Sequence, residues 1–286
     1  MNLAERLGHS PESKLLVLHS DDMGCCEAAN LATFELMEAG RLTSGSVIIP
    51  APETRQAADY QHAHPEADLG VHLALTSEHP KRRWAGVLGP VATPSLHDAD
   101  GYLPMTVAEV VANADPDEAG RELRAQVELA LALGIDVTHL DSHMGAVFDR
   151  KFLPAWTGLA VEFGLPTFIP TAFRGRPAVT ALEEAGVPLI DELLHETYGP
   201  DRATKEVLFA KMLGGLKRGF THFLIHPAHD AADLRENIAG WETRVADYEV
   251  FAEGSLHQGL KAAGVQLVGY RALRDAIRAG DFRTGV

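Results

Sequence analysis

The feature that most constrains the fold is an alternation of short apolar runs and longer helical stretches along almost the whole chain. This alternation predicts βα units and a parallel sheet, because a chain needs a crossover to return to the start of a parallel neighbour. We interpret the apolar runs as strands at 15–18, 44–49, 69–75, 137–143, 166–170, 188–190, 221–225 and 265–270. Helical patterns cover most of the intervals, notably 30–39, 54–64, 117–133, 202–216 and 241–262.

The number of alternations and the length of 286 residues together fit one barrel-sized domain. We predict a single α/β domain over residues 1–286, folded as a TIM-like (β/α) barrel. A doubly wound open sheet is the alternative, although no Gly-x-Gly-x-x-Gly turn follows the first strand to favour dinucleotide binding. The segment at about 76–116 is rich in proline, glycine and aspartate. We expect it to be a long insertion loop within the domain.

The composition excludes several classes of protein. The chain has 25 Lys and Arg against 40 Asp and Glu, a formal net charge of −15, so we expect no nucleic-acid partner. No apolar run approaches the roughly 20 residues of a membrane-spanning helix, which predicts no membrane span. Residues 1–13 lack the pattern of a secretory signal, and the two cysteines, Cys25 and Cys26, are adjacent and cannot form a framework of disulfides. These features predict a cytoplasmic protein.

Polar side chains gather where the predicted strands end. Asp21 and Asp22 follow the first strand, His72 lies in the third, Asp141-Ser142-His143 ends the fourth, and His226 follows the strand at 221–225. Because the carboxyl ends of parallel strands open on one face of a βα array, residues far apart in sequence are expected to meet there. The sequence therefore predicts an active site at that face.

Two adjacent carboxylates repel each other unless a cation neutralises them or one keeps a proton. A turn at the strand end can bring both Asp21 and Asp22 to one site, one on a metal ion and the other available as a base. The alternative interpretation is that one of them caps the following helix. For His72 the alternative is a core histidine bonded to a backbone carbonyl.

His139, Asp141 and His143 recur at every second residue, which places them on one face of a strand. Imidazole nitrogens and carboxylate oxygens are ligands that zinc accepts, so Asp22, His72 and His143 are a candidate ligand set with an open position for water. The alternative is a group of polar residues at a strand end. His226 is a candidate general acid for a departing amine, or a histidine bonded to a loop carbonyl.

Five short motifs and a terminal one occur in an order that resembles the YdjC/ChbG-like carbohydrate deacetylases, a family that includes chitooligosaccharide deacetylases and relatives acting on hopanoid N-acetylglucosamine. They are Leu-Leu-Val-Leu-His-Ser-Asp-Asp-Met-Gly (15–24), Arg-Leu-Thr-Ser-Gly-Ser-Val (41–47), Leu-Gly-Val-His-Leu-Ala-Leu-Thr (69–76), Thr-His-Leu-Asp-Ser-His-Met (138–144), Ile-His-Pro (225–227) and Leu-Val-Gly-Tyr-Arg-Ala-Leu (267–273). The resemblance covers nearly the whole chain. It implies a distorted (β/α) TIM-like barrel.

The resemblance also implies roles for the candidate residues. One divalent metal ion, zinc or magnesium, would be held by Asp22, His72 and His143, with Asp21 as the base and His226 at the leaving group. The implied substrate is a small N-acetylated saccharide or glycoconjugate that loses acetate. A homodimer is a possible assembly of the chain. Another metal-dependent hydrolase, a phosphoesterase or an amidohydrolase, and a non-catalytic carbohydrate-binding relative are the alternatives.

This chain departs from the common family pattern at two places. His19-Ser20 stands where the family commonly has Asn-Ala before the aspartate pair. Met144-Gly145-Ala146 follows His143, where many members have further histidines. The candidate ligand set is kept, so these departures are expected to alter the pocket or the surroundings of the metal.

Overall fold

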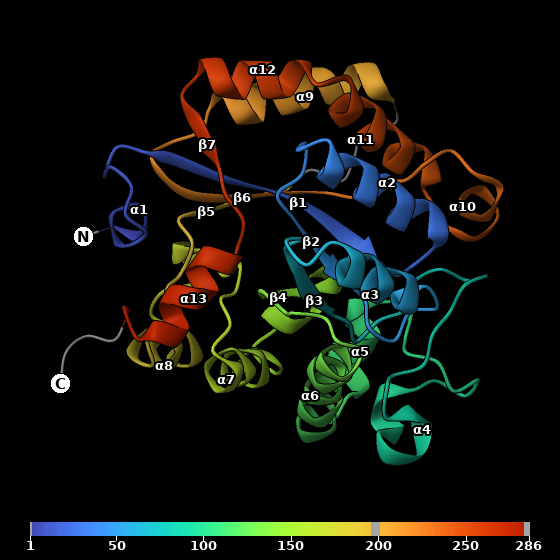
Figure 1. The fold of residues 1–286 in the computed structure, drawn as a ribbon. Helices are drawn as coiled ribbons and strands as arrows, with labels where there is room; N and C mark the ends of the chain where they lie inside the picture. The colour runs from blue at the N-terminus through green and yellow to red at the C-terminus, as the bar shows by residue number, and fades with distance from the viewer. Residues whose placement is uncertain (1, 196–200, 283–286) are drawn as a thin grey trace.

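A curled sheet of parallel strands forms the centre of the molecule (Figure 1), in a computed structural model that describes residues 2–195 and 201–282. Six strands are hydrogen-bonded side by side, and a seventh pairs only with the most N-terminal of the six. In spatial order they are β4 (Leu140–Ser142), β3 (Leu69–Leu73), β2 (Ser44–Val47), β1 (Lys14–Met23), β6 (Gly219–Ile225) and β5 (Glu192–His195), with β7 (Val265–Leu267) beside β1. The parallel pairing agrees with the predicted βα units.

Strand β1 organises the sheet because it has three partners. Along one edge it pairs with β6 over Lys14–Ser20. Along the other edge it pairs first with β7, over Lys14–Leu16, and then with β2, from His19 onward. Its apolar residues are buried on both faces, as expected for the central strand of a sheet covered on both sides.

The barrel is closed between β4 and β5 by single bridges. Leu140 pairs with Thr167, and Pro170 pairs with Ile190, two residues before β5 begins. The predicted strand at 166–170 therefore supplies only two bridge positions. The predicted strand at 188–190 is followed by β5, a strand that the sequence did not predict. The fourth strand, β4, is shorter than the predicted 137–143. The α/β class and the distorted TIM-like barrel are confirmed. The distortion is the seam, by which we mean the two single bridges Leu140–Thr167 and Pro170–Ile190 that close the barrel.

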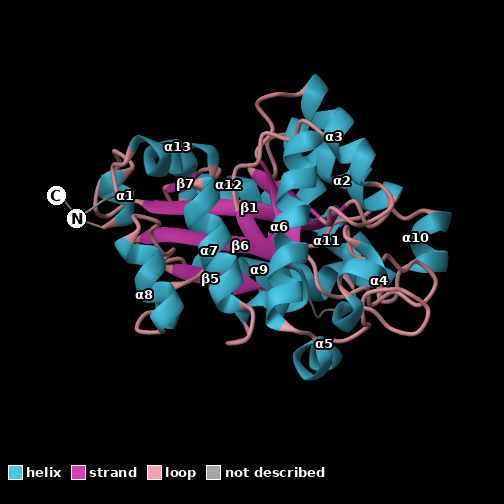
Figure 2. Cartoon of the chain, turned by 90° about the horizontal axis from the view of Figure 1, so that it is seen from below, coloured by secondary structure: helices cyan, strands magenta, loops and turns pink. Residues whose placement is uncertain are grey.

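Helices surround the sheet (Figure 2). They are α1 (Leu3–Arg6), α2 (Glu27–Glu38), α3 (Thr54–Ala63), α6 (Pro116–Ala132), α7 (Leu153–Phe163), α8 (Pro177–Glu184), α9 (Arg202–Gly214), α10 (Ala232–Asn237), α11 (Trp241–Glu253), α12 (Ser255–Ala262) and α13 (Arg271–Ala279). The predicted helix at 241–262 is two helices, because Gly254 has φ 85 and ends α11 in a left-handed conformation. Within 2–195 and 201–282, no helix combines the length and the apolar character that a membrane crossing requires.

The segment at 76–116 is more ordered than the predicted loop. It contains α4 (Gly89–Ala92), the 3₁₀ turn η1 (Pro94–Leu96) and α5 (Val107–Asn113). The carboxylate of Glu122 on α6 accepts the backbone N–H groups of Val87 and Leu88, and the indole of Trp84 is buried and donates to the carbonyl of Thr76. These bonds satisfy backbone and side-chain donors that a loop would leave to water, and they hold the start of the segment against the barrel.

Candidate active site

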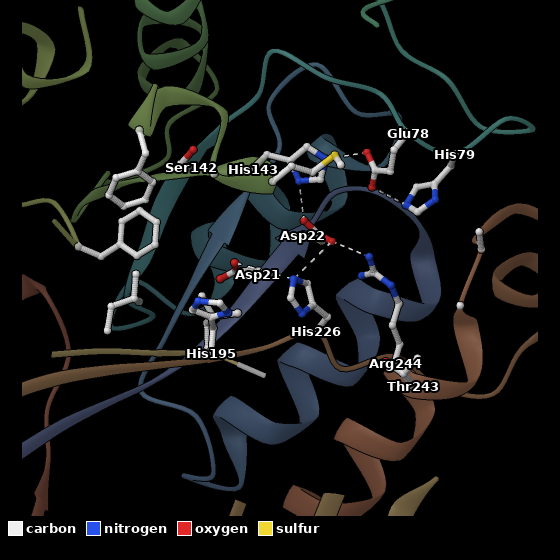
Figure 3. A pocket seen from close by; sticks show the side chains of 18 residues that line it. Asp21, Asp22, Glu78, His79, Ser142, His143, His195, His226, Thr243 and Arg244 are labelled. Carbon is white, nitrogen blue, oxygen red and sulfur yellow. Dashed lines mark hydrogen bonds and ion pairs between the residues drawn. The ribbon is translucent and has the colours of Figure 1, made fainter. Parts of the chain in front are cut away.

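The carboxyl ends of the central strands open into a cavity of about 760 Å³. Its polar wall carries Asp21, Asp22, Glu78, His143, His226 and Arg244 (Figure 3). Apolar side chains, among them Phe148, Phe168 and Leu193, also line the cavity. Four of the five predicted site residues thus line one cavity. The fifth, His72, is buried directly behind Asp22.

A bulge at the end of β1 places both aspartates at the cavity. The β1–β2 register shifts between Ser20 and Met23, and Asp22 has φ 64, in the left-handed region. Extended backbone would turn successive side chains to opposite faces, but a bulge with one left-handed residue re-aims one of them. Cys26 occupies the N-cap of α2, so the alternative that an aspartate caps this helix is wrong. A left-handed non-glycine residue is costly and is typical of functional sites.

Asp22, His72 and His143 come together as the sequence predicts. Asp22 Oδ1 lies 3.2 Å from His72 Nε2 and 2.9 Å from His143 Nδ1, and one ligand atom from each residue lies within 4.8 Å of the others. The second nitrogen of each imidazole faces a carboxylate: His72 Nδ1 lies 2.7 Å from Asp141 Oδ1, and His143 Nε2 lies 2.7 Å from Glu78 Oε2. Such carboxylate–histidine pairs orient histidines that bind metals, so this donor set fits a divalent ion.

The electrostatics of this set also favour a cation. Burial alone would lower the pKa of His143, but Glu78 and Asp22 outweigh it and raise that pKa to about 9. Burial opposes a charge on His72 too, yet Asp141 and Asp21 raise its pKa well above the ordinary value. The pKa of Asp22 is held well below its ordinary value, against its burial, by Arg244 and His143. Positive charge is therefore favoured where the three side chains meet.

Asp21 presents its two oxygens to different surroundings. Oδ2 lies 3.8 Å from His72 Nε2 and 3.9 Å from His226 Nε2, on the cavity side. Oδ1 lies 2.8 Å from His19 Nδ1, in the barrel interior. The carboxylate is thus beside the candidate ligands without being one of that set, as a base requires.

His226 is held at the cavity through its backbone. Its N–H donates to Asp247 Oδ2 over 2.9 Å, and Asp247 is itself paired with Lys205 in the interior. The side chain is 18% exposed, and Nε2 lies 3.9 Å from Asp22 Oδ2 as well as from Asp21 Oδ2. Burial outweighs the nearby aspartates and lowers the pKa of His226, so the ring is neutral at neutral pH.

Two residues of the polar wall were not predicted. Glu78 lies in the segment after the third strand, and Arg244 lies on α11 and donates from Nη2 to Asp22 Oδ2 over 2.6 Å. Glu78 and His79 are polar residues just beyond a predicted strand, and this is the same pattern that identified the other site residues. No motif marks Arg244, because its place depends on how a distant helix packs.

The period-two prediction for His139, Asp141 and His143 is wrong in part. Strand β4 ends at Ser142, and His143 begins a 3₁₀ turn, so the strand face does not extend to it. His139 faces the interior, with Nε2 at 2.9 Å from His19 Nε2. Asp141 supports His72. After His143, Met144 and Gly145 are both left-handed, with φ 50 and 67, and Met144 is exposed at the cavity.

A family model described as "YdjC-like protein" matches residues 15–262. That range contains every residue of the polar wall and most of the chain. The chain belongs to the YdjC-like family. The sequence resemblance is therefore confirmed at the level of the family.

YdjC-like relatives match over nearly their whole length. A carbohydrate deacetylase of Thermus thermophilus is 31% identical over 97% of this chain and 100% of its own. A carbohydrate deacetylase of Thermoanaerobacter pseudethanolicus is 26% identical over 91% of this chain and 100% of its own. A crystal structure from Enterococcus faecalis superposes with a TM-score of 0.77 at 23% identity, covering 91% of this chain and 99% of that one, and supports the fold.

Proposed function

We propose that this YdjC-like protein is a metal-dependent carbohydrate N-deacetylase that hydrolyses the acetamide of an N-acetylated sugar or glycoconjugate and releases acetate. The observation that carries the proposal is Asp21, which points a carboxylate oxygen into the cavity beside the three-residue donor set. The names of the most similar relatives, carbohydrate deacetylases matched over their full length, support the reaction and the class of substrate.

The metal would be held by Asp22, His72 and His143. Two imidazoles and one carboxylate are a donor set typical of catalytic zinc, although magnesium is the alternative when carboxylates and water dominate. A divalent ion bound there would polarise the acetamide carbonyl and make water more acidic. Asp141 and Glu78 would fix the orientation of the two imidazoles through their second nitrogens.

The other residues of the polar wall would move protons and hold charge. Asp21 would accept the proton of the attacking water at Oδ2, the oxygen that faces the cavity. The neutral His226 ring, 3.9 Å from that oxygen, would receive this proton and donate it to the departing amine. Arg244 would keep Asp22 ionised and oriented.

The test combines metal analysis with acetate release from N-acetylglucosamine oligomers, with and without a chelator. We expect about one divalent ion per chain and chelator-sensitive acetate release. Asp21→Asn and Asp22→Asn are matched variants of neighbouring carboxylates. Asp21→Asn is expected to keep the ion and lose about 10²–10⁴-fold in kcat, whereas Asp22→Asn is expected to lose both.

Each contrary outcome points to a different reaction. Near-normal turnover by Asp21→Asn would remove the assigned base. Bound metal with phosphate release in place of acetate release would indicate a phosphoesterase, and release of other amines would indicate a different amidohydrolase. Bound sugar without turnover would indicate a carbohydrate-binding relative. A chain that binds no metal after reconstitution would overturn the ligand assignment.

A further inference from the structure

The turn that follows β6 and carries His226 is held at both ends by one helix, α11. Its central residue, Pro227, has no N–H, so His226 and Ala228 supply the backbone donors of the turn. The N–H of His226 donates to Asp247 Oδ2 over 2.9 Å. The N–H of Ala228 donates to the carbonyl of Arg244 over 3.1 Å. Asp247 and Arg244 are three residues apart on α11 and so lie on the same side of that helix.

The same helix also holds Asp22. Arg244 Nη2 donates to Asp22 Oδ2 over 2.6 Å, and His226 Nε2 lies 3.9 Å from that same oxygen. Figure 3 shows the side chains of Arg244 and His226 converging on Asp22. Because His226 and Asp22 are each hydrogen-bonded to a residue of α11, this helix fixes the one relative to the other.

Little freedom is left to the His226 ring. A residue that precedes proline is largely confined to extended backbone conformations. With its N–H bonded to Asp247 as well, His226 places its Nε2 atom mainly through its two side-chain torsions. That atom lies 3.9 Å from Asp21 Oδ2, about 1 Å beyond hydrogen-bond distance. A shift of the turn by about this amount therefore decides whether the two atoms can exchange a proton.

Asp247 is an ionised residue in an apolar part of the interior. It pairs with Lys205 of α9, and the two residues are 1% and 0% exposed. Lys205 Nζ lies 5.5 Å from the ring centre of Phe209, which packs on Phe251 of α11. Well-packed apolar side chains would join two helices at least as well as a buried ion pair, so packing alone does not account for these charges.

The two oxygens of Asp247 divide the work. Oδ1 faces the ammonium group of Lys205, and Oδ2 accepts the N–H of His226. A carboxylate makes a stronger hydrogen bond to an N–H group than a neutral acceptor does. The ion pair also fixes the orientation of the carboxylate, because one of its oxygens is already bound.

We propose that Asp247, anchored by Lys205, is a positioning residue of the deacetylase reaction. Its Oδ2 atom holds the backbone of His226 so that the ring stays directed at Asp21 and at the leaving group. Asp247 and Lys205 touch no reacting atom, and their effect reaches the reaction only through His226. The proposal rests on the proposed function in one respect, that His226 serves the leaving group.

Two matched double variants test this role in the full chain saturated with zinc. Lys205→Met/Asp247→Asn and Lys205→Met/Asp247→Leu both remove the ion pair, and the new side chains at position 247 are similar in size. Only the asparagine keeps an oxygen that can accept the N–H of His226. We measure acetate release from N-acetylglucosamine oligomers together with zinc content.

The two double variants are expected to differ in kcat alone. The variant with Asp247→Asn should keep kcat within about threefold of the wild type, whereas the variant with Asp247→Leu should lose about 10- to 100-fold. KM and zinc content should be unchanged in both, because neither residue lines the cavity or belongs to the candidate ligand set. Equal kcat values in the two variants would show that the pair serves packing only, and would overturn the proposal.

A surface pair between the same two helices provides the control. Arg202 of α9 donates to Glu253 at the end of α11 over 2.7 Å, and both side chains are exposed. Glu253→Gln therefore weakens a contact between α9 and α11 without touching the turn. We expect it to leave kcat unchanged. A loss as large as that of the variant with Asp247→Leu would assign the effect to helix packing and contradict the proposal.

Hydrogen exchange measures the bond itself and needs no variant to fold. In the wild type we expect the His226 N–H to exchange with deuterium at least about 100-fold more slowly than an unprotected amide. In the variant with Asp247→Leu it should exchange about 100-fold faster than in the variant with Asp247→Asn. The N–H of Ala228 is the internal reference, because its acceptor is a backbone carbonyl in every variant. An unprotected His226 N–H in the wild type would overturn the proposal.

Failure of the proposed function can be told apart from failure of this inference. If the wild type releases no acetate, the proposed function fails, while slow exchange still supports the hold of Asp247 on the turn and fast exchange overturns it. If the wild type releases acetate, His226→Ala does not, and the two double variants turn over equally, only the positioning role fails.

Discussion

Two groups of buried histidines lie within one barrel, and the groups that face their rings differ. The outer cluster, His72 and His143 with Asp22, lies at the cavity. The inner cluster consists of His19, His139 and His222. His72, His143, His139 and His222 are all 2% exposed or less, yet the pKa values of the first two are raised while those of the last two are lowered well below the ordinary value.

The difference comes from the groups that face the ring nitrogens. In the outer cluster both nitrogens of each ring face carboxylates: Asp22 and Asp141 for His72, Asp22 and Glu78 for His143. In the inner cluster, His139 and His222 face another ring, a phenol or a hydroxyl, whereas His19 also faces the Asp21 carboxylate through Nδ1. Burial lowers the pKa of each of the four rings, and only the carboxylates that face His72 and His143 reverse the sign. The outer cluster is therefore suited to a cation, and the rings of His139 and His222 are suited to neutral hydrogen bonds.

The largest expected effect is the loss of metal binding when a histidine of the outer cluster, but not of the inner cluster, is replaced. His72→Ala is expected to abolish stoichiometric metal binding and acetate release, because it removes a candidate ligand. His222→Gln is its counterpart in the inner cluster and is expected to keep the metal while losing about 1–3 kcal/mol of stability, since the Tyr270 hydroxyl loses its buried partner. Metal analysis and denaturant unfolding measure both. Loss of the metal in His222→Gln would show that the inner cluster is also needed for metal binding, which contradicts the comparison.

Metal binding should displace protons from the outer cluster alone. At pH 7 the metal-free protein holds His143 and His72 as imidazoliums, because their pKa values are raised, to about 9 for His143. Ligation needs the neutral rings, so about two protons are expected to leave per ion, and affinity should rise about 100-fold per pH unit near neutrality. Calorimetry in buffers of different ionisation enthalpy counts the protons. Binding without proton release would contradict the charged state of the cluster.

The stability of the metal-free protein should fall as the pH rises. The pKa of His143 is about 9 in the folded chain and about 6.5 when unfolded, so protonation stabilises the fold fully below pH 6.5. This stabilisation is lost as the pH passes through 9, by up to about 3 kcal/mol. Urea unfolding between pH 6.5 and 9.5 tests this, and the His143→Gln variant should keep only the part of the slope that the raised pKa of His72 contributes. Stability that rises over this range would show that the sign is wrong.

The smallest expected effect concerns the inner cluster and its packing. Gly70→Ala places a Cβ atom 2.4 Å from the His139 ring, which Tyr270 prevents from moving aside. We expect a loss of about 2 kcal/mol in the free energy of unfolding, as for other overpacked cores. Metal stoichiometry should be unchanged, because His139, the side chain that the new Cβ atom meets, is not one of the candidate ligands. Unfolding curves and metal analysis of the same preparation measure both, and a variant as stable as the wild type would contradict the packing argument.

The sequence predicts those features that depend on neighbouring residues or on the shared direction of parallel strands. Asp21, Asp22, His72, His143 and His226 could be placed at one face because each lies at or near a strand end. It does not reveal the bulge at Asp22, because a left-handed residue inside a strand leaves no periodic signal. Arg244 was missed because its contact with Asp22 spans 222 positions, and β5 was missed because its pairing depends on β6.

The seam that closes the barrel bears on how the range of substrates can change. Phe168 lies between the two bridge positions of one seam segment, and Leu193 and His195 lie on β5. All three line the cavity. Single bridges, unlike full ladders, tolerate insertions and altered curvature at little cost to the rest of the sheet. Remodelling of the seam would therefore change the shape of the cavity, while the histidines and aspartates at the ends of the central strands would keep their spacing.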